Sequence, residues 1–325
     1  MSAGENHDEG IVLLCGEVRT GLLPAHQALD IRAAAQLLRL RADERVLVSE
    51  RPNLYARSPD TLTGVDCPLP SASGAKVRAV GTVAVRGTLT EGRVLQTSAR
   101  LGLAARGPDH RRPWGHYLVR PGTLEPFGRL PREAVAEGVL AGARRGELDV
   151  GLIADGLLTQ LLRHPLLDQH PPFKSRPTRL RWTALPAEAG AGGPSIERLT
   201  LAEDELRTLR LRVPPGADPA EVAGLCEDLA LHDWLLTTVV RLLDGSRLGS
   251  ADGTAVVRAL RPAVDHLLHL WMPRARLEPS LAALWDVLEE RPGFTRQWQV
   301  LVRRIRDQLA LHAIPALHQE AVMAP

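Results

Sequence analysis

Apolar and polar residues alternate along much of the first two thirds of the chain, as they do in β-strands. The clearest alternation covers residues 77–89, where odd positions are apolar or small and most even positions carry arginine or threonine. It resumes over residues 95–103, after a turn at Glu91 and Gly92. Period two on both sides of a glycine turn predicts an antiparallel hairpin with one face in the core and one in solvent.

Other segments complete an α+β pattern up to residue 215. Further strands are predicted at 11–23, 46–49, 117–119, 179–185, 196–201 and 206–213, and helices at 30–40, 131–145 and 149–163. Proline and glycine are frequent in 51–76, which predicts a long loop. Residues 10–215 are therefore expected to form an α+β domain with a mainly antiparallel sheet, after a disordered tail at 1–9.

The best-defined helix signal covers residues 218–244. Asp218 is a good N-cap, Pro219 suits the first helical position, and Gly245 favours a left-handed stop. Over 229–243 apolar residues cover almost every face, which predicts a helix buried on several sides.

Only helices are predicted after this segment, at 254–271, 279–290 and 295–311. In the last one, Trp298, Leu301, Val302, Ile305 and Leu309 share one face. Residues 216–325 are therefore expected to form an α-helical domain, a bundle packed around 218–244.

Composition is typical of a soluble globular protein, with 44% hydrophobic and 24% charged residues in a chain of 325. A net charge of +2 provides no field for nucleic acid, and no apolar run reaches the length of a membrane span. The three cysteines, Cys15, Cys67 and Cys226, form no CxxC pair, so a reducing, cytoplasmic location is expected. No Walker A, HExxH or GxSxG motif is present, so we expect no cofactor.

The first candidate site combines His232 and Asp233 with His266 and His269 on the next helix. A His-Asp pair with further histidines on a neighbouring helix resembles the ligand set of HD-type metal phosphohydrolases, in which metals activate water. The favoured alternative is that His232 bonds within packed helices and that Asp233 pairs with an arginine.

The second candidate is Cys67, a nucleophile with His110 or His116 as its base. Asp66 or Asp109 would orient that base. The alternative is a small buried cysteine in an ordered loop.

The third candidate is the stretch DHRRPWGHY, in which Arg111, Arg112 and Trp114 would bind a phosphate and stack on a base. The alternative is a connecting loop whose tryptophan fills a gap under the sheet.

The fourth candidate is a basic strip near the end of the chain, which would meet an acidic partner. The alternative is a solvated helix face. Its members are Arg291, Arg296, Arg303, Arg304 and Arg306.

Several stretches together resemble an uncharacterised family of actinobacterial cytoplasmic proteins that is common in streptomycetes. They are GEVRTGLLP, TGVDCPLPSASG, LCEDLALHDWLLTT, RPAVDHLLHLWMP, RPGFTRQW and RIRDQLAL. The resemblance extends over about residues 16–311 and brings no catalytic residues with it. It implies a gene neighbourhood that includes a variant P-loop protein, and hence a partnership with a P-loop NTPase.

The function expected from the sequence is that of a non-enzymatic interaction or accessory protein, a subunit of a P-loop NTPase-associated bacterial system. Two alternatives stay open. One is the HD-like metal-dependent phosphohydrolase, and the other is a small-molecule or nucleotide sensor that uses the Cys67 and Trp114 loops.

Overall fold

The computed structural model describes residues 10–323, apart from 108–109, 189–193, 204 and 247–252. The predicted tail at 1–9 lies outside the described residues. The strands are β1 (Ile11–Leu22), β2 (Leu47–Ser49), β3 (Tyr55–Arg57), β4 (Thr61–Pro68), β5 (Arg78–Thr90), β6 (Val94–Ala104), β7 (Thr123–Pro126), β8 (Thr178–Pro186), β9 (Ser195–Glu203) and β10 (Leu206–Val213). The helices are α1 (Ile31–Leu37), α2 (Trp114–Leu118), α3 (Arg132–Ala141), α4 (Val150–Leu162), α5 (Pro219–Gly245), α6 (Gly253–His266), α7 (Pro279–Glu290) and α8 (Phe294–Met323).

In the described part of the chain, ten strands form one mixed sheet in the order β2-β3-β5-β7-β6-β1-β8-β10-β9, with β4 paired to β5. The pairs β8–β10 and β6–β7 are parallel, and the other pairs are antiparallel. The prediction of an α+β fold with a mainly antiparallel sheet is thereby confirmed.

The predicted hairpin is present as β5 and β6, which pair from Ala84–Arg100 to Thr90–Val94. Its turn places Glu91 and Gly92 at positive φ. A Cβ atom at Gly92 would lie 2.0 Å from the carbonyl oxygen of Leu29, so only glycine fits there.

The prediction that one face of this hairpin is in solvent is wrong, because nearly every residue of β5 and β6 is buried. The odd-numbered apolar positions pack with α4 in one hydrophobic cluster. The even-numbered polar positions lie on the other face, where Arg86 and Gln96 bind α5. Arg86 and Gln96 tolerate this burial because α5 provides hydrogen-bond partners for them, and Arg100 binds Asp60 instead.

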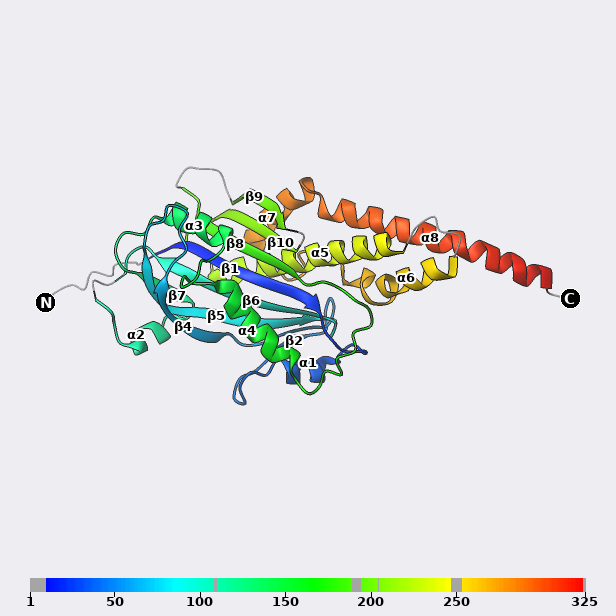
Figure 1. Ribbon diagram of the computed structural model, residues 1–325, viewed down its shortest axis with the longest axis horizontal. Helices are drawn as coiled ribbons and strands as arrows, with labels where there is room; N and C mark the ends of the chain where they lie inside the picture. The colour runs from blue at the N-terminus through cyan, green and yellow to red at the C-terminus, as the bar shows by residue number, and fades with distance from the viewer. Residues whose placement is uncertain (1–9, 108–109, 189–193, 204, 247–252, 324–325) are drawn as a thin grey trace.

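Helices cover the sheet on both faces, as Figure 1 shows for α4 and α5. On the first face, α1, α3 and α4 contribute to one hydrophobic cluster. On the second face, β1, β8 and β10 share a cluster with α5, α6, α7 and α8. The predicted domain boundary near residue 215 lies between β10 and α5, and this second cluster contains residues from both sides of it. The division into domains stays a prediction.

Helix α5 forms where the sequence predicts it. The Asp218 carboxylate accepts a hydrogen bond from the backbone N–H of Ala220 at 2.9 Å, as an N-cap does. Gly245 is part of the helix, which has its C-cap at Ser246, so the predicted left-handed stop is wrong. The hydroxyl of Ser246 donates to the Leu243 carbonyl at 2.6 Å and satisfies one of the terminal backbone groups.

The last helix extends beyond its predicted end. Its five predicted core residues all belong to the cluster around α5. Past them, α8 continues to Met323 and projects beyond the end of the sheet (Figure 1). Among the described residues, no helix has both the length and the apolar character that crossing a membrane requires.

Two local predictions are wrong. The predicted loop at 51–76 contains β3 and β4, and β4 pairs with β5 along its whole length. Backbone hydrogen bonds hold β4, and its side chains show no clear alternation of burial. The predicted strand at 117–119 is replaced by helix α2, in which the rings of Trp114 and Tyr117, one turn apart, are in contact.

Candidate functional site

His232 is a buried residue of α5 that bonds within the packed helices. Its Nδ1 donates to the backbone carbonyl of Asp228 at 2.7 Å, one turn earlier. The edges of its ring meet Trp271 and Trp285, with centroids 4.8 and 5.5 Å away. The aromatic rings surround the imidazole and keep it within the core.

Asp233 contacts a different partner. Its carboxylate accepts a hydrogen bond from Arg207 of β10 at 3.0 Å. Burial raises the pKa of Asp233, and the charge of Arg207 opposes this rise without cancelling it. The contacts of His232 and Asp233 therefore agree with the favoured alternative, in which the histidine bonds within the packed helices and the aspartate pairs with an arginine.

The predicted metal ligands are not brought together. His266 stacks on Phe173 at a centroid distance of 6.2 Å, and His269 lies in the following 3-10 turn, Leu268–Leu270. Among the described residues, no three His, Cys, Asp or Glu side chains are grouped so that they could hold a metal. The geometry of the described residues therefore gives no support to the HD-type alternative at His232, Asp233, His266 and His269.

Cys67 lies half-buried on β4, and no histidine of the described residues is bonded to it. Burial and then the charge of Asp66 raise the pKa of its thiol. His116 is bound instead to Glu125 at 2.7 Å, and Asp109 lies outside the described residues. A raised pKa keeps the thiol protonated, which is the opposite of what a nucleophilic cysteine requires.

The predicted phosphate- and base-binding loop packs against the outer surface of β4. A Cβ atom at Gly64 would lie 3.1 Å from the ring of Trp114, and the guanidinium of Arg111 lies 5.6 Å from that ring. Arg111 also pairs with Asp66 at 3.2 Å. The backbone N–H of Arg112 donates to the hydroxyl of Tyr117 at 3.0 Å. Trp114 thus packs over Gly64 of β4. This is close to the alternative interpretation, in which the tryptophan of a connecting loop fills a gap under the sheet.

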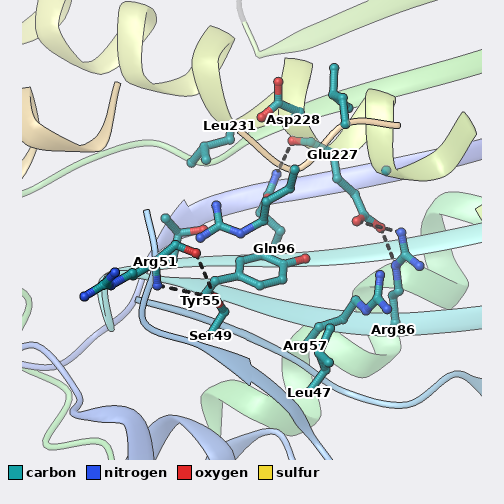
Figure 2. Close-up of a pocket in the computed structure, with 14 residues that line it drawn as sticks. Leu47, Ser49, Arg51, Tyr55, Arg57, Arg86, Gln96, Glu227, Asp228 and Leu231 are labelled. Atoms are coloured by element: carbon teal, nitrogen blue, oxygen red, sulfur yellow. Dashed lines mark hydrogen bonds and ion pairs between the residues drawn. The ribbon is translucent and has the colours of Figure 1, made fainter. Parts of the chain in front are cut away.

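The structure contains a polar cavity that the sequence does not reveal. It lies between β2, β3, the β5–β6 hairpin, α5 and the segment before α7, and has a volume of about 280 Å³ (Figure 2). Its polar lining residues are Ser49, Arg51, Tyr55, Arg57, Arg86, Thr90, Gln96, Glu227, Asp228 and Arg276.

A buried ion pair forms one wall of this cavity. Two guanidinium nitrogens of Arg86 donate to the two carboxylate oxygens of Glu227 at 2.7 and 2.8 Å. Burial acts to lower the pKa of Arg86, but the charge of Glu227 and its hydrogen bonds outweigh burial and raise it. The amide of Gln96 donates to the Glu227 backbone carbonyl at 2.9 Å, so β5 and β6 both hold α5 in place.

Tyr55 and Arg276 form the opposite wall. The guanidinium of Arg276 lies over the Tyr55 ring, 4.2 Å from its centroid, and donates to the backbone carbonyl of Asn53 at 2.9 Å. Burial, and then the charge of Glu227, raise the pKa of Tyr55 to about 12, so its hydroxyl stays protonated at neutral pH. Figure 2 shows this hydroxyl pointing toward Arg86 and Glu227.

A second hollow is an open groove of about 1120 Å³ between β9, α5 and the end of α7. The exposed side chains of Leu201, Val240 and Val287 line it, together with the buried Leu236 and Phe294.

Sequence signals for these two hollows are weak. The alternation of β5 predicts that Arg86, at an even position, faces solvent. In the structure Arg86 is buried. On α5, Glu227 and Asp228 lie between apolar residues, and acidic residues at such positions of a buried helix hint at a buried partner. Comparison with protein-family models, curated proteins and solved structures found no match to this chain.

Proposed function

We propose that this chain is a non-enzymatic interaction protein that binds a protein partner along the groove between β9, α5 and α7. The observation that carries the proposal is the gathering of exposed apolar side chains there. Leu201 is 61% exposed, and Val240 and Val287 are each 40% exposed. Exposed apolar residues that line one groove are typical of a protein-binding surface.

The strand that borders the groove supports this proposal. Among the described strands, β9 lies at the end of the sheet and pairs only with β10. The backbone groups on its outer edge are therefore available to a further strand, and an extended peptide binds such an edge by adding to the sheet.

Charged residues around the groove are largely paired with each other. Arg207 bonds Asp233, and Arg198 bonds Glu137 at 2.7 Å. Glu197 receives hydrogen bonds from Arg210 and Arg212. Because these charges are already paired within the chain, a binding protein would mainly bury the apolar side chains of the groove. The fitting occupant is an extended, apolar segment.

The proposed partner is a P-loop NTPase. The resemblance to a family encoded beside a variant P-loop protein supports this choice, and it also supports a cytoplasmic setting. In this proposal residues 216–325 form a helical bundle that presents α5, α7 and α8 to the partner. The arginines of α8 add a basic surface nearby, since Arg303, Arg304 and Arg306 are exposed.

The alternative of a metal-dependent phosphohydrolase has no support in the geometry. Of its ligand candidates, His232 and His266 contact aromatic rings and Asp233 contacts an arginine.

Co-expression of the chain with the neighbouring P-loop protein tests the proposal. We expect the two to co-purify and to elute together in size-exclusion chromatography, and we expect ATP or GTP to change the yield of the complex. Separate elution of the two proteins, both with and without nucleotide, would show that the NTPase is not the partner.

A further inference from the structure

We propose that the polar cavity between β2, β3 and α5 binds the phosphate or carboxylate group of a small molecule. This inference goes beyond the proposed function and does not depend on it, since a different surface is involved. It rests on the charge, the unpaired donors and the size of the cavity.

Positive charge exceeds negative charge in this cavity. Of the described residues that line it, four are arginines (Arg51, Arg57, Arg86 and Arg276) and two are carboxylates (Glu227 and Asp228), which leaves an excess of two. Such an excess inside a recess attracts an anion, because the surrounding protein screens charge less than water does.

The carboxylates are already engaged. Both oxygens of Glu227 accept hydrogen bonds from Arg86. One oxygen of Asp228 accepts a hydrogen bond from the backbone N–H of Arg274 at 3.0 Å. Burial raises the pKa of Asp228.

The side chain of Arg57 is the principal unpaired donor. Within the described part of the chain, its guanidinium has no hydrogen bond or ion pair, and Figure 2 shows it extending toward Arg86. Asp60 interacts electrostatically with Arg57, but its carboxylate binds Arg100 at 3.0 and 2.5 Å. Two guanidinium groups that approach each other beside a cavity are a common arrangement for binding an oxyanion.

Tyr55 provides a second unpaired donor. Its hydroxyl makes no hydrogen bond to the described residues, and its raised pKa keeps the proton in place. The stacked guanidinium of Arg276 fixes the ring. The Tyr55 hydroxyl and the Arg57 guanidinium both approach the Arg86–Glu227 pair (Figure 2), and the two residues are two positions apart on β3.

The volume indicates the size of the ligand. At about 280 Å³, the cavity is just below the range of small-molecule pockets, roughly 300–1,000 Å³. It has room for one small anionic molecule or for the anionic end of a larger one.

Isothermal titration calorimetry at low ionic strength tests the inference, with inorganic phosphate and citrate as separate probes. We expect at least one of them to bind the wild type, and the preferred probe distinguishes a phosphate site from a carboxylate site. Arg57→Gln should weaken that binding about tenfold or more, because the variant loses a charged donor. Arg129→Gln removes an exposed arginine outside the cavity and should bind like the wild type.

Tyr55→Phe provides a second test, and it decides the matter if Arg57→Gln does not fold. This variant keeps the ring under Arg276 and removes only the hydroxyl, so binding should weaken about fivefold. The inference is overturned if neither probe binds the wild type. It is also overturned if Arg57→Gln and Tyr55→Phe bind like the wild type, or if Arg129→Gln weakens binding as much as Arg57→Gln does.

Discussion

The ion pair of Arg86 and Glu227 connects the centre of the sheet to α5 and is almost completely buried, with 4% and 6% of the two side chains exposed. Removing two charges from water costs free energy that only good geometry and further hydrogen bonds repay. Both conditions are met here, since the pair is bidentate and Arg86 also donates to the Ala220 carbonyl at 3.4 Å. Loss of one partner would leave the other charge buried without compensation.

Glu227→Gln should therefore lower the free energy of unfolding by about 3–5 kcal/mol. Urea denaturation followed by circular dichroism measures this loss. Asp265→Asn is the matched control, because it breaks the exposed Arg261–Asp265 pair and should cost less than about 1 kcal/mol. Equal losses in the two variants would show that the buried pair contributes no more to stability than the exposed pair does.

Asp60 should make stability depend on pH in the acidic range. Burial acts to raise its pKa, but the hydrogen bond and charge of Arg100, with the charges of Arg86 and Arg57, outweigh burial and hold the pKa below 3.8. The folded state therefore binds the Asp60 proton less tightly than the unfolded state does. The resulting stabilisation is present above the unfolded-state pKa and is lost as the pH falls through the folded-state pKa.

Asp60→Asn removes this ionisation. The difference in free energy of unfolding between the wild type and the variant should be constant near neutral pH and should shrink below about pH 4. Urea denaturation at a series of pH values measures the difference. A difference that grows on acidification would show that the pKa is shifted in the other direction.

Among the elements, α5 and the β5–β6 hairpin could be predicted because their signals are local. Asp218 and Pro219 mark the start of the helix, and the alternation on both sides of Gly92 marks the hairpin. Strand β4 carries no such signal, since it is held by backbone pairing with β5.

The cavity could not be predicted from local patterns. Arg86 and Glu227 are 141 positions apart, and Asn53 and Arg276 are 223 apart. Only the packing of α5 on the even-numbered face of the hairpin brings them together. The candidate residues proposed from the sequence were chosen by residue type and short spacing, and in the structure His232, Asp233 and His266 contact partners outside their candidate set.

Strand β1 depends on a glycine for its packing against β8. Gly16 lies opposite Trp182, and a Cβ atom there would lie 2.5 Å from the Ala99 carbonyl oxygen and 2.6 Å from the Trp182 ring. The strand continues through this position, as predicted from the sequence. The missing side chain makes room for the buried indole.

Gly16→Ala should thus destabilise the protein by about 1–3 kcal/mol through overpacking. Thermal unfolding measures the effect as a lower Tm. Gly10→Ala is the control, because no atom of the described part of the chain lies within 4 Å of a Cβ atom at that position. If both variants melt at the wild-type temperature, the space beside Trp182 must be larger than the structure indicates.

At the scale of the whole molecule, α5 contacts both proposed binding sites. Glu227 and Asp228, in its first half, line the cavity, and Leu236 and Val240, in its second half, line the groove. The helix that the sequence marks most clearly is therefore central to the hydrophobic core and also forms a wall of each site.

We propose that the groove beside β9 binds the P-loop protein. Leu201→Asp places a charge on an exposed apolar position of the groove, and Leu152→Asp makes the same change at a 65% exposed position of α4, away from the groove.

Calorimetric titration of the P-loop protein into the wild type and both variants tests this claim most directly. We expect Leu201→Asp to weaken binding about tenfold or more, through the cost of burying an unpaired carboxylate, and Leu152→Asp to bind like the wild type. The account is contradicted if the wild type does not bind or if the two variants bind equally well.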